Sequence, residues 1–261
     1  MVNLLIKVII ILQEEFMKEE IYTIPVMDGF KEDCECPFCA MRRTLEDKTI
    51  DYVLSPAYME EDVRGETNDK GFCHEHMQRL YAEGNALGLA LMLHSHMKAQ
   101  HETVQKLLSQ STSGKRGLFS KKQADVSPLE ANRRHFTESC YVCHRVDEIF
   151  DRYISAFFML WKKGGEFRDV VTGSQGFCLN HFMQIYEAAA QHLSADAAKE
   201  FRDQIAALEM ENLKRVEDDL EWFTLKFDYR YKDKPWKNAK DALPRSILKI
   251  NGQFVDRSPK K

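Results

Sequence analysis

A pattern of cysteines and histidines occurs twice in this chain and constrains its fold more than any other feature. Each copy has a Cys-x-x-Cys pair and, further along, a Gly-Phe-Cys-x-x-His segment. The two pairs begin at Cys36 and Cys140, 104 residues apart, and the two segments place their cysteines at Cys73 and Cys178, 105 residues apart. This regular offset indicates two copies of one structural unit.

Three cysteines and one histidine in each copy form a donor set that Zn²⁺ prefers in closed, structural sites. Residues three apart lie on the same face of a helical turn, so a Cys-x-x-His pair at a helix start can bind one ion. The positive end of that helix would stabilise the negative charge of the thiolates. The sequence therefore predicts two separate sites and two zinc ions per chain: Cys36, Cys39, Cys73 and His76 in the first site, and Cys140, Cys143, Cys178 and His181 in the second.

The alternative for Cys36-Pro-Phe-Cys39 is a dithiol redox centre or a zinc-linked redox switch. A glutaredoxin-like site is expected after a strand in a βαβ unit, whereas residues 21–30 offer at most one short strand. A dithiol enzyme also needs neither a Cys-x-x-His segment nor a second copy. Iron or an iron–sulfur cluster is the remaining alternative, and structural zinc is preferred.

Two further cysteine features bear on the assignment of zinc. Cys140-Tyr-Val-Cys143-His144 matches the attachment pattern of haem c, but haem c requires export, for which the sequence gives no clear signal. The first copy also has Ala40 where this histidine would stand. Haem is therefore rejected, and Cys34, which lies outside the repeat, is interpreted as an ordinary thiol.

Composition and periodicity predict an all-α fold, a duplicated zinc-pinned helical repeat that forms a bundle with a long C-terminal helix. Gly and Pro are sparse, at 12 and 7 residues, which favours helices. After Ser194, apolar residues recur at spacings of three and four, interrupted only by Asn212. Helices are expected at residues 37–54, 57–66, 72–110, 141–163 and 166–172 and from Cys178 onward, with a loop at residues 68–71. A last long helix is expected to start at Ser194 and to carry the apolar stripe Phe201, Ile205, Leu208, Val216, Leu220, Phe223 and Phe227.

The repeat also suggests a division of the chain. The first repeat is assigned to residues 17–110, the second to 136–192, and the long helix and C-terminal segment to 193–261. Residues 111–135 are expected to form an exposed linker, because this part is rich in Ser, Gly and Lys and lacks an apolar period. Residues 1–16 are expected to be an over-extended reading frame before Met17 or a disordered segment, because Gln13-Glu14-Glu15 can be encoded by a purine-rich ribosome-binding sequence. Their apolar run is too short to span a bilayer.

Net charge and cysteine count indicate which classes of binding partner and which cellular compartment to expect. The net charge of −4 gives no basis for nucleic-acid or membrane binding, so any partner is expected to be another protein. An odd count of seven cysteines, without a clear secretory signal, favours a reducing compartment, the cytoplasm.

Two other groups of residues are candidate binding surfaces. His94, Met97 and His101 share a helix face with Leu87 and Ala90, and this face could line a pocket or hold a second kind of metal site. The favoured interpretation is hydrogen-bonded core or surface histidines. Residues 229–247 mix aromatic and basic side chains, and they are interpreted as a loop and a last helix packed on the bundle through Trp236.

Five motifs resemble a family of uncharacterised bacterial proteins, domain of unknown function 6062. They are "YTIPVMDGF", "ECPFCAMRR", "SPAYMEEDVRGETNDKGFC", "GNALGLALMLHSHM" and "FDYRYKDKPWKNAKDALPRSI". The resemblance covers about residues 20–252. It implies a cytoplasmic bacterial protein and carries no activity with it.

These observations favour a zinc-binding helical protein that acts as a protein-binding or regulatory module. The alternative is a metal- or redox-responsive sensor, or an enzyme, that uses the His94/His101 face or the Cys-x-x-Cys cysteines. No nucleophile–base pair or phosphate-binding loop can be identified in the sequence, so no catalytic residue is assigned and a non-enzymatic role is preferred.

Overall fold

The computed structural model describes residues 21–112, 132–133, 135–136 and 139–255. The predicted segment 1–16 and most of the predicted linker lie outside these residues. Over the described ranges the secondary structure is helical and contains no strand, which confirms the all-α prediction. None of the helices in this part of the chain has both the length and the apolar character needed to cross a membrane.

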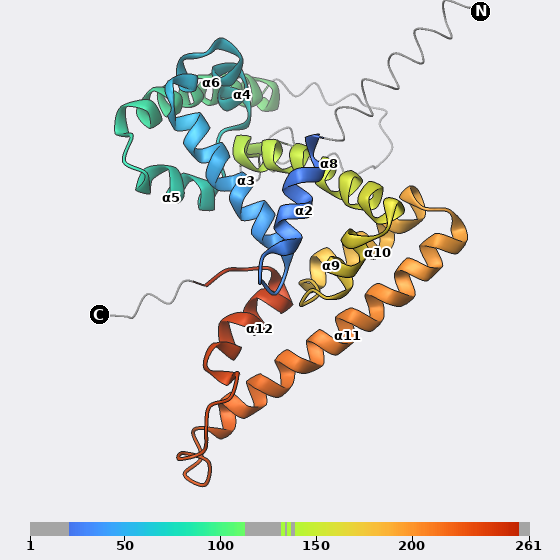
Figure 1. The fold of residues 1–261 in the computed structure, drawn as a ribbon. Helices are drawn as coiled ribbons and strands as arrows, with labels where there is room; N and C mark the ends of the chain where they lie inside the picture. The colour runs from blue at the N-terminus through green and yellow to red at the C-terminus, as the bar shows by residue number, and fades with distance from the viewer. Residues whose placement is uncertain (1–20, 113–131, 134, 137–138, 256–261) are drawn as a thin grey trace, which may run out of the picture. The chain divides into compact units, whose positions relative to one another are not determined.

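The helices largely follow the sequence-based expectations (Figure 1). Residues 21–30, which offered at most one short strand, are largely helical instead. In chain order the elements are α2 (Thr23–Lys31), α3 (Pro37–Leu54), η1 (Pro56–Met59), α4 (Glu61–Lys70), α5 (His74–Ala82), α6 (Ala86–Thr112), α8 (Tyr141–Lys163), α9 (Glu166–Thr172), α10 (Leu179–His192), α11 (Ala195–Leu225), η2 (Ala239–Asp241) and α12 (Ala242–Asn251).

The chain divides into two compact units. The described residues of Met1–Arg43 and Phe150–Lys261 form unit 1, and those of Thr44–Ile149 form unit 2. The division falls inside α3 and inside α8, so each of these helices begins in one unit and ends in the other. Each unit therefore combines segments from both sequence repeats.

Aromatic side chains fill the core of unit 1. Phe38, on the first turn of α3, is fully buried. Its ring centroid lies 5.4 Å from those of Phe30 and Phe157 and 5.7 Å from that of Phe177. Edge-to-face and stacked contacts of this kind add to the free energy gained by burial. The start of α3, which carries the first Cys-x-x-Cys pair, is thereby fixed against α2, α8 and the segment that precedes α10.

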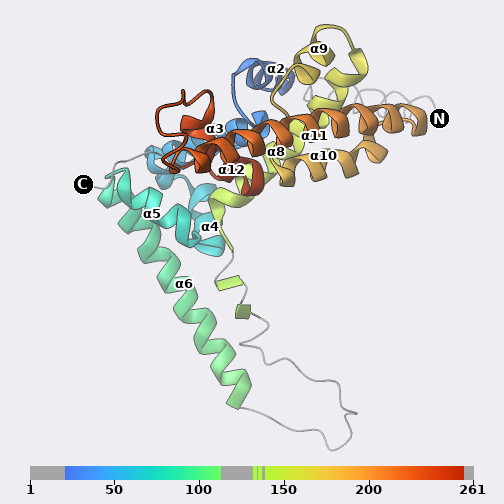
Figure 2. The same cartoon turned by 90° about the horizontal axis from the view of Figure 1, so that it is seen from below.

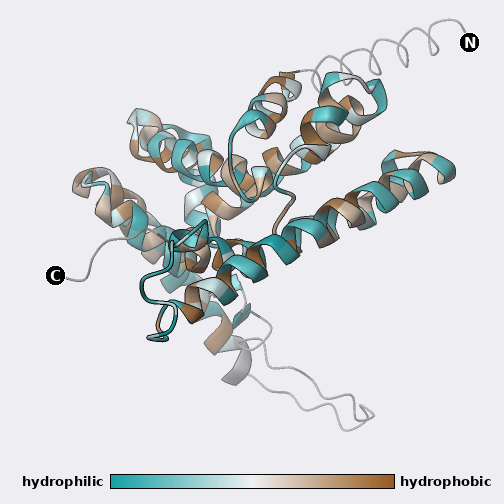
Figure 3. Cartoon of the chain, turned by 60° about the horizontal axis from the view of Figure 1, so that its bottom comes forward, coloured by the Kyte–Doolittle hydropathy of each residue, from teal (hydrophilic) through white to brown (hydrophobic). Residues whose placement is uncertain are grey.

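The long helix α11 packs against α10 and α12 within unit 1, and Figure 2 shows the three helices close together. The first part of the predicted apolar stripe is buried, whereas Phe227 lies beyond the helix end and is 78% exposed. Asn212 is also buried, and its side chain donates to the carbonyl of Leu208 and accepts from Arg215 Nε. Figure 3 shows hydrophilic residues along much of α11, with hydrophobic residues between them.

Unit 2 corrects three details of the prediction. The helix expected at residues 57–66 is a short 3₁₀ helix, η1, followed by α4. Residues 68–70 belong to α4, and the chain turns only at Gly71, which has a φ of 60°. The single helix expected at residues 72–110 is two helices. The chain breaks at Gly84, with a φ of 84°, and the Asn85 side chain accepts a hydrogen bond from the amide of Gly88 in the first turn of α6. An asparagine that bonds forward in this way begins a new helix.

The aromatic core predicts a large effect of shortening Phe38. Phe38→Ala should lower the free energy of unfolding by about 3–5 kcal/mol, because it removes a fully buried ring and leaves a cavity. Urea titration followed by circular dichroism measures this change. The matched control is Phe227→Ala, which alters an exposed ring and should leave the urea midpoint nearly unchanged. Equal effects of the two substitutions would contradict the placement of Phe38.

Candidate metal sites

The structure brings the eight predicted ligand residues together in two clusters. In each cluster the four candidate ligand atoms all lie within 4.8 Å of one another. Site 1 consists of Cys36, Cys39, Cys178 and His181, and site 2 consists of Cys73, His76, Cys140 and Cys143. Site 1 lies within unit 1 and site 2 within unit 2.

The predicted pairing of the motifs was wrong. Cys36 and Cys39 were assigned to Cys73 and His76, and Cys140 and Cys143 to Cys178 and His181. The structure exchanges the partners, so each cluster takes its Cys-x-x-Cys pair from one repeat and its Cys-x-x-His pair from the other. The physical reason is that α3 and α8 each start at a Cys-x-x-Cys pair and then pass into the other unit. The Cys-x-x-His segment of the same repeat follows in that other unit.

Helix starts position the four side chains of site 1. Cys36 directly precedes α3, and its carbonyl accepts from the amide of Ala40, while Cys178 is the N-cap residue of α10. The Nδ1 atom of His181 lies 3.5 Å from the Sγ atom of Cys36, 3.3 Å from that of Cys39 and 3.2 Å from that of Cys178. All four residues are at most 5% exposed.

Site 2 repeats this arrangement at the starts of α5 and α8. The Nδ1 atom of His76 lies 3.2 Å from Cys73 Sγ, 3.4 Å from Cys140 Sγ and 3.3 Å from Cys143 Sγ. The Sγ atoms of Cys73 and Cys143 are 3.9 Å apart. A tetrahedral zinc ion with Zn–S bonds of about 2.3 Å would separate its sulfur ligands by about 3.8 Å. The spacing of donors in site 2 therefore fits one ion at its centre.

The electrostatics of the thiols depend on their burial and on hydrogen bonds within each cluster. Burial raises the pKa of Cys36 to about 12, because its thiolate would lose hydration. Hydrogen bonds from Cys36 and Cys39 lower the pKa of Cys178, and a hydrogen bond from Cys143 lowers that of Cys140. These hydrogen bonds favour the thiolate form of one cysteine in each cluster. A metal ion that binds all three sulfurs must displace the remaining protons, so metal affinity should fall as the pH falls.

A buried lysine forms hydrogen bonds with the two backbone segments that carry the ligands of site 1. Lys249 of α12 is 1% exposed, and its Nζ atom donates to the carbonyls of Glu35, at 2.9 Å, and Phe177, at 3.1 Å, and to that of Gln175. Burial lowers the pKa of Lys249, while the nearby Glu209 and Glu35 carboxylates oppose that change. The bonded carbonyls precede Cys36 and Cys178, so one ammonium group joins the two segments that carry the ligands.

Two carboxylates also form hydrogen bonds around site 1. Glu209, fully buried on α11, accepts a hydrogen bond from the amide of Phe177 at 2.8 Å. Glu35 accepts from Arg215 at 2.6 and 3.0 Å through both of its carboxylate oxygens. Lys249, Glu209 and Glu35 were not predicted from the sequence as parts of the site. The available signal was the spacing of Lys249 from Ala242 and Ser246, two other buried residues of α12, which places the lysine on the apolar face of its helix.

The glycine of each Gly-Phe-Cys segment forms a tight turn that lies close to a side chain of another helix. Gly71 and Gly176 have φ values of 60° and 76°, in the left-handed region that glycine tolerates. A Cβ atom at Gly71 would meet His96 at 2.6 Å, and one at Gly176 would meet Glu209 at 2.8 Å. In each repeat, therefore, the turn before the third cysteine packs against a polar side chain of a following helix.

The remaining candidate residues lie outside both clusters. His94, Met97 and His101 are exposed on α6, and the metal-ligand clusters found among the described residues include neither histidine. His144 is exposed beside Glu148, at 3.7 Å. Trp236 packs on Phe223, with ring centroids 6.0 Å apart.

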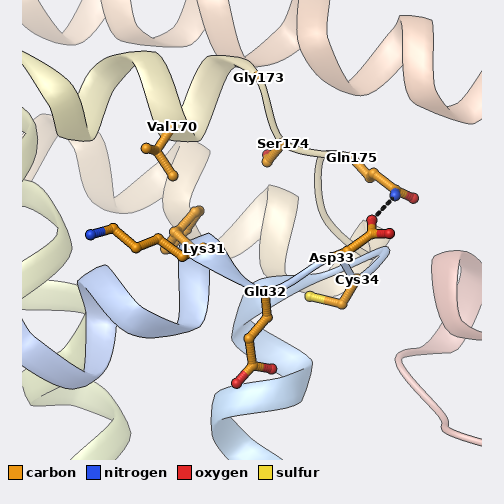
Figure 4. Close-up of a pocket in the computed structure, with 9 residues that line it drawn as sticks. Lys31, Glu32, Asp33, Cys34, Val170, Gly173, Ser174 and Gln175 are labelled. Atoms are coloured by element: carbon orange, nitrogen blue, oxygen red, sulfur yellow. Dashed lines mark hydrogen bonds between the residues drawn. The ribbon is translucent and has the colours of Figure 1, made fainter.

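Cys34 lines a pocket of about 440 Å³ in unit 1 (Figure 4). The pocket lies between the segment that follows α2 and the segment that follows α9, where the Gln175 amide donates to Asp33. Burial raises the pKa of Cys34 to about 11, so the side chain is a protonated thiol near neutral pH. Cys34 belongs to neither metal-ligand cluster.

The fold and the clusters define an all-α protein with two sets of three cysteines and one histidine that can hold metal ions. Residues 17–257 match the model described as "Family of unknown function (DUF6062)", so the chain belongs to this family, as the sequence motifs indicated. A search of the curated proteins and a search of the solved structures each returned no match.

The exchanged pairing can be tested by metal content. The double variant Cys36→Ser/Cys178→Ser should lose one ion per chain, because both substitutions affect site 1. Cys36→Ser/Cys73→Ser should lose both ions, because each substitution affects a different site. Elemental analysis of purified protein measures the ratio, and circular dichroism checks that the variants remain helical. If Cys36→Ser/Cys178→Ser loses both ions and Cys36→Ser/Cys73→Ser loses only one, the pairing within each repeat is correct.

Proposed function

We propose that this protein is a helical scaffold held by two structural zinc ions and that it acts in the cytoplasm as a protein-binding or regulatory module. One observation carries the proposal: three thiol sulfurs and one imidazole nitrogen converge within 4.8 Å in each of two clusters. This number and type of donors complete the tetrahedral coordination of zinc without a place for substrate.

The closed donor sets support a structural role. A catalytic zinc site keeps one coordination position for water or substrate, usually with three protein ligands. Sites 1 and 2 each offer four protein ligands, and in site 1 all four are buried. Thiolates and imidazole also match the preference of zinc over hard cations such as Mg²⁺ or Ca²⁺, which take oxygen ligands.

The ions would act as cross-links between distant parts of the chain. In site 1 the residues joined are up to 145 positions apart, and in site 2 up to 70. Binding to a structural zinc site contributes an apparent free energy of about 10–16 kcal/mol, whereas a whole domain is stable by only ~5–15 kcal/mol. Loss of either ion should therefore loosen the unit that contains it.

A protein is the proposed partner class. Exposed apolar side chains of unit 2 support this choice, among them Tyr81 on α5, 80% exposed, and Leu87 on α6, 67% exposed. The net charge of −4 does not favour an anionic partner such as nucleic acid.

Metal analysis and chelation test the structural role. Purified protein should contain about two zinc ions per chain. A strong chelator should reduce the helical circular dichroism signal and lower the melting temperature far more than a reductant alone, because the metal is part of the folded state. Protein that keeps its helical signal and melting temperature after complete metal removal would contradict a structural role. A reversible Cys36–Cys39 disulfide in such protein would support the redox alternative.

A further inference from the structure

The two metal sites differ in their access to solvent. Cys36, Cys39 and Cys178 of site 1 are all buried. In site 2, Cys140 is buried, but Cys73 and Cys143 are partly exposed. A zinc ion leaves a four-ligand site stepwise, as an incoming ligand takes the position of a departing thiolate. The two partly exposed thiols of site 2 allow that first exchange, whereas the buried thiols of site 1 hinder it.

The segments around the two sites are also held together differently. In site 2, the amide of Tyr141 donates to the carbonyl of Gly71 at 2.9 Å and joins the two ligand-bearing segments. The corresponding residues of site 1 are Pro37 and Gly176, and proline has no amide hydrogen to donate. Lys249 supplies the missing link through its three carbonyl bonds. Site 1 therefore depends on α12, which follows both repeats in the chain.

The end of α12 also covers the sulfurs of site 1. Gly252 follows the helix with a φ of 74°. A Cβ atom there would lie 3.4 Å from Cys39 Sγ and 3.5 Å from Cys178 Sγ, so the backbone itself packs against the thiols.

We propose that site 2 is an exchangeable site through which the protein responds to thiophilic metal ions and competing thiol or chelating ligands, whereas site 1 releases its ion much more slowly. This inference rests on the proposed function, since it requires both sites to bind zinc. In the exchange, a donor atom of the competing ligand binds zinc as the thiolate of Cys73 or Cys143 leaves and takes up a proton. Unit 2 is then the part of the protein that loosens when zinc is withdrawn.

The wild-type protein provides the direct test. Zinc-loaded protein is mixed with excess pyridylazoresorcinol, and zinc release is followed by absorbance. N-ethylmaleimide present in the same solution adds to each thiol as it becomes free, and mass spectrometry of peptides identifies the labelled cysteines. We expect two phases of zinc release that differ by at least about tenfold in rate. Cys73, Cys140 and Cys143 should be labelled in the fast phase, and Cys36, Cys39 and Cys178 in the slow phase.

Lys249→Met tests the cause of the difference. Loss of a group that orients metal ligands typically costs about 10–100-fold in metal affinity, so this variant should accelerate the slow phase and leave the fast phase unchanged. The matched control is Lys226→Met. Lys226 is also buried and donates to three carbonyls, those of Tyr231, Lys232 and Lys234, but that segment carries no metal ligand. This control should change neither phase.

The outcomes separate the inference from the proposed function. Protein purified without bound metal, and unable to take up zinc, would overturn the proposed function itself. Two bound ions that leave at one rate, or labelling of the site 1 cysteines first, would overturn only the inference. If Lys249→Met does not fold, the labelling order in the wild-type protein still decides the result.

Discussion

Convergence of soft donors at paired helix starts is the arrangement on which the rest of this structure depends. Each cluster takes two cysteines from the start of α3 or α8 and a cysteine and histidine from the start of α10 or α5. Three thiolates buried together would repel one another in a medium of low polarity, so without a metal ion these thiols must keep protons. The proposed zinc ion would take the place of these protons and would link the two repeats.

The surroundings of site 1 show how the fold supports that link. The aromatic core around Phe38 fixes the start of α3, and Glu209 and Lys249 fix the segment that leads to Cys178. Burying an ammonium group is unfavourable unless its hydrogen bonds are satisfied. Lys249 meets this condition with three carbonyls. The C-terminal helix is thus part of the metal site although it contributes no ligand.

The sequence allowed the donor residues and many helices to be predicted, since both depend on local spacing. The helices at residues 37–54, 141–163 and 166–172 have the expected bounds. The pairing of motifs could not be predicted in this way, because a repeat shows which residues are equivalent and not which are near. The break at Gly84 was missed because apolar residues continue on both sides of it. Lys249 was missed because its role depends on carbonyls contributed by distant segments.

A crystal structure with anomalous diffraction at the zinc absorption edge tests the central claim most directly. The account predicts two anomalous peaks per chain, one bonded to Cys36 and Cys178 and the other to Cys73 and Cys140, with Zn–S distances of about 2.3 Å. A peak bonded to both Cys36 and Cys73 would contradict the link between repeats. Intact clusters without any metal, in protein grown with zinc, would contradict the metal-held scaffold itself.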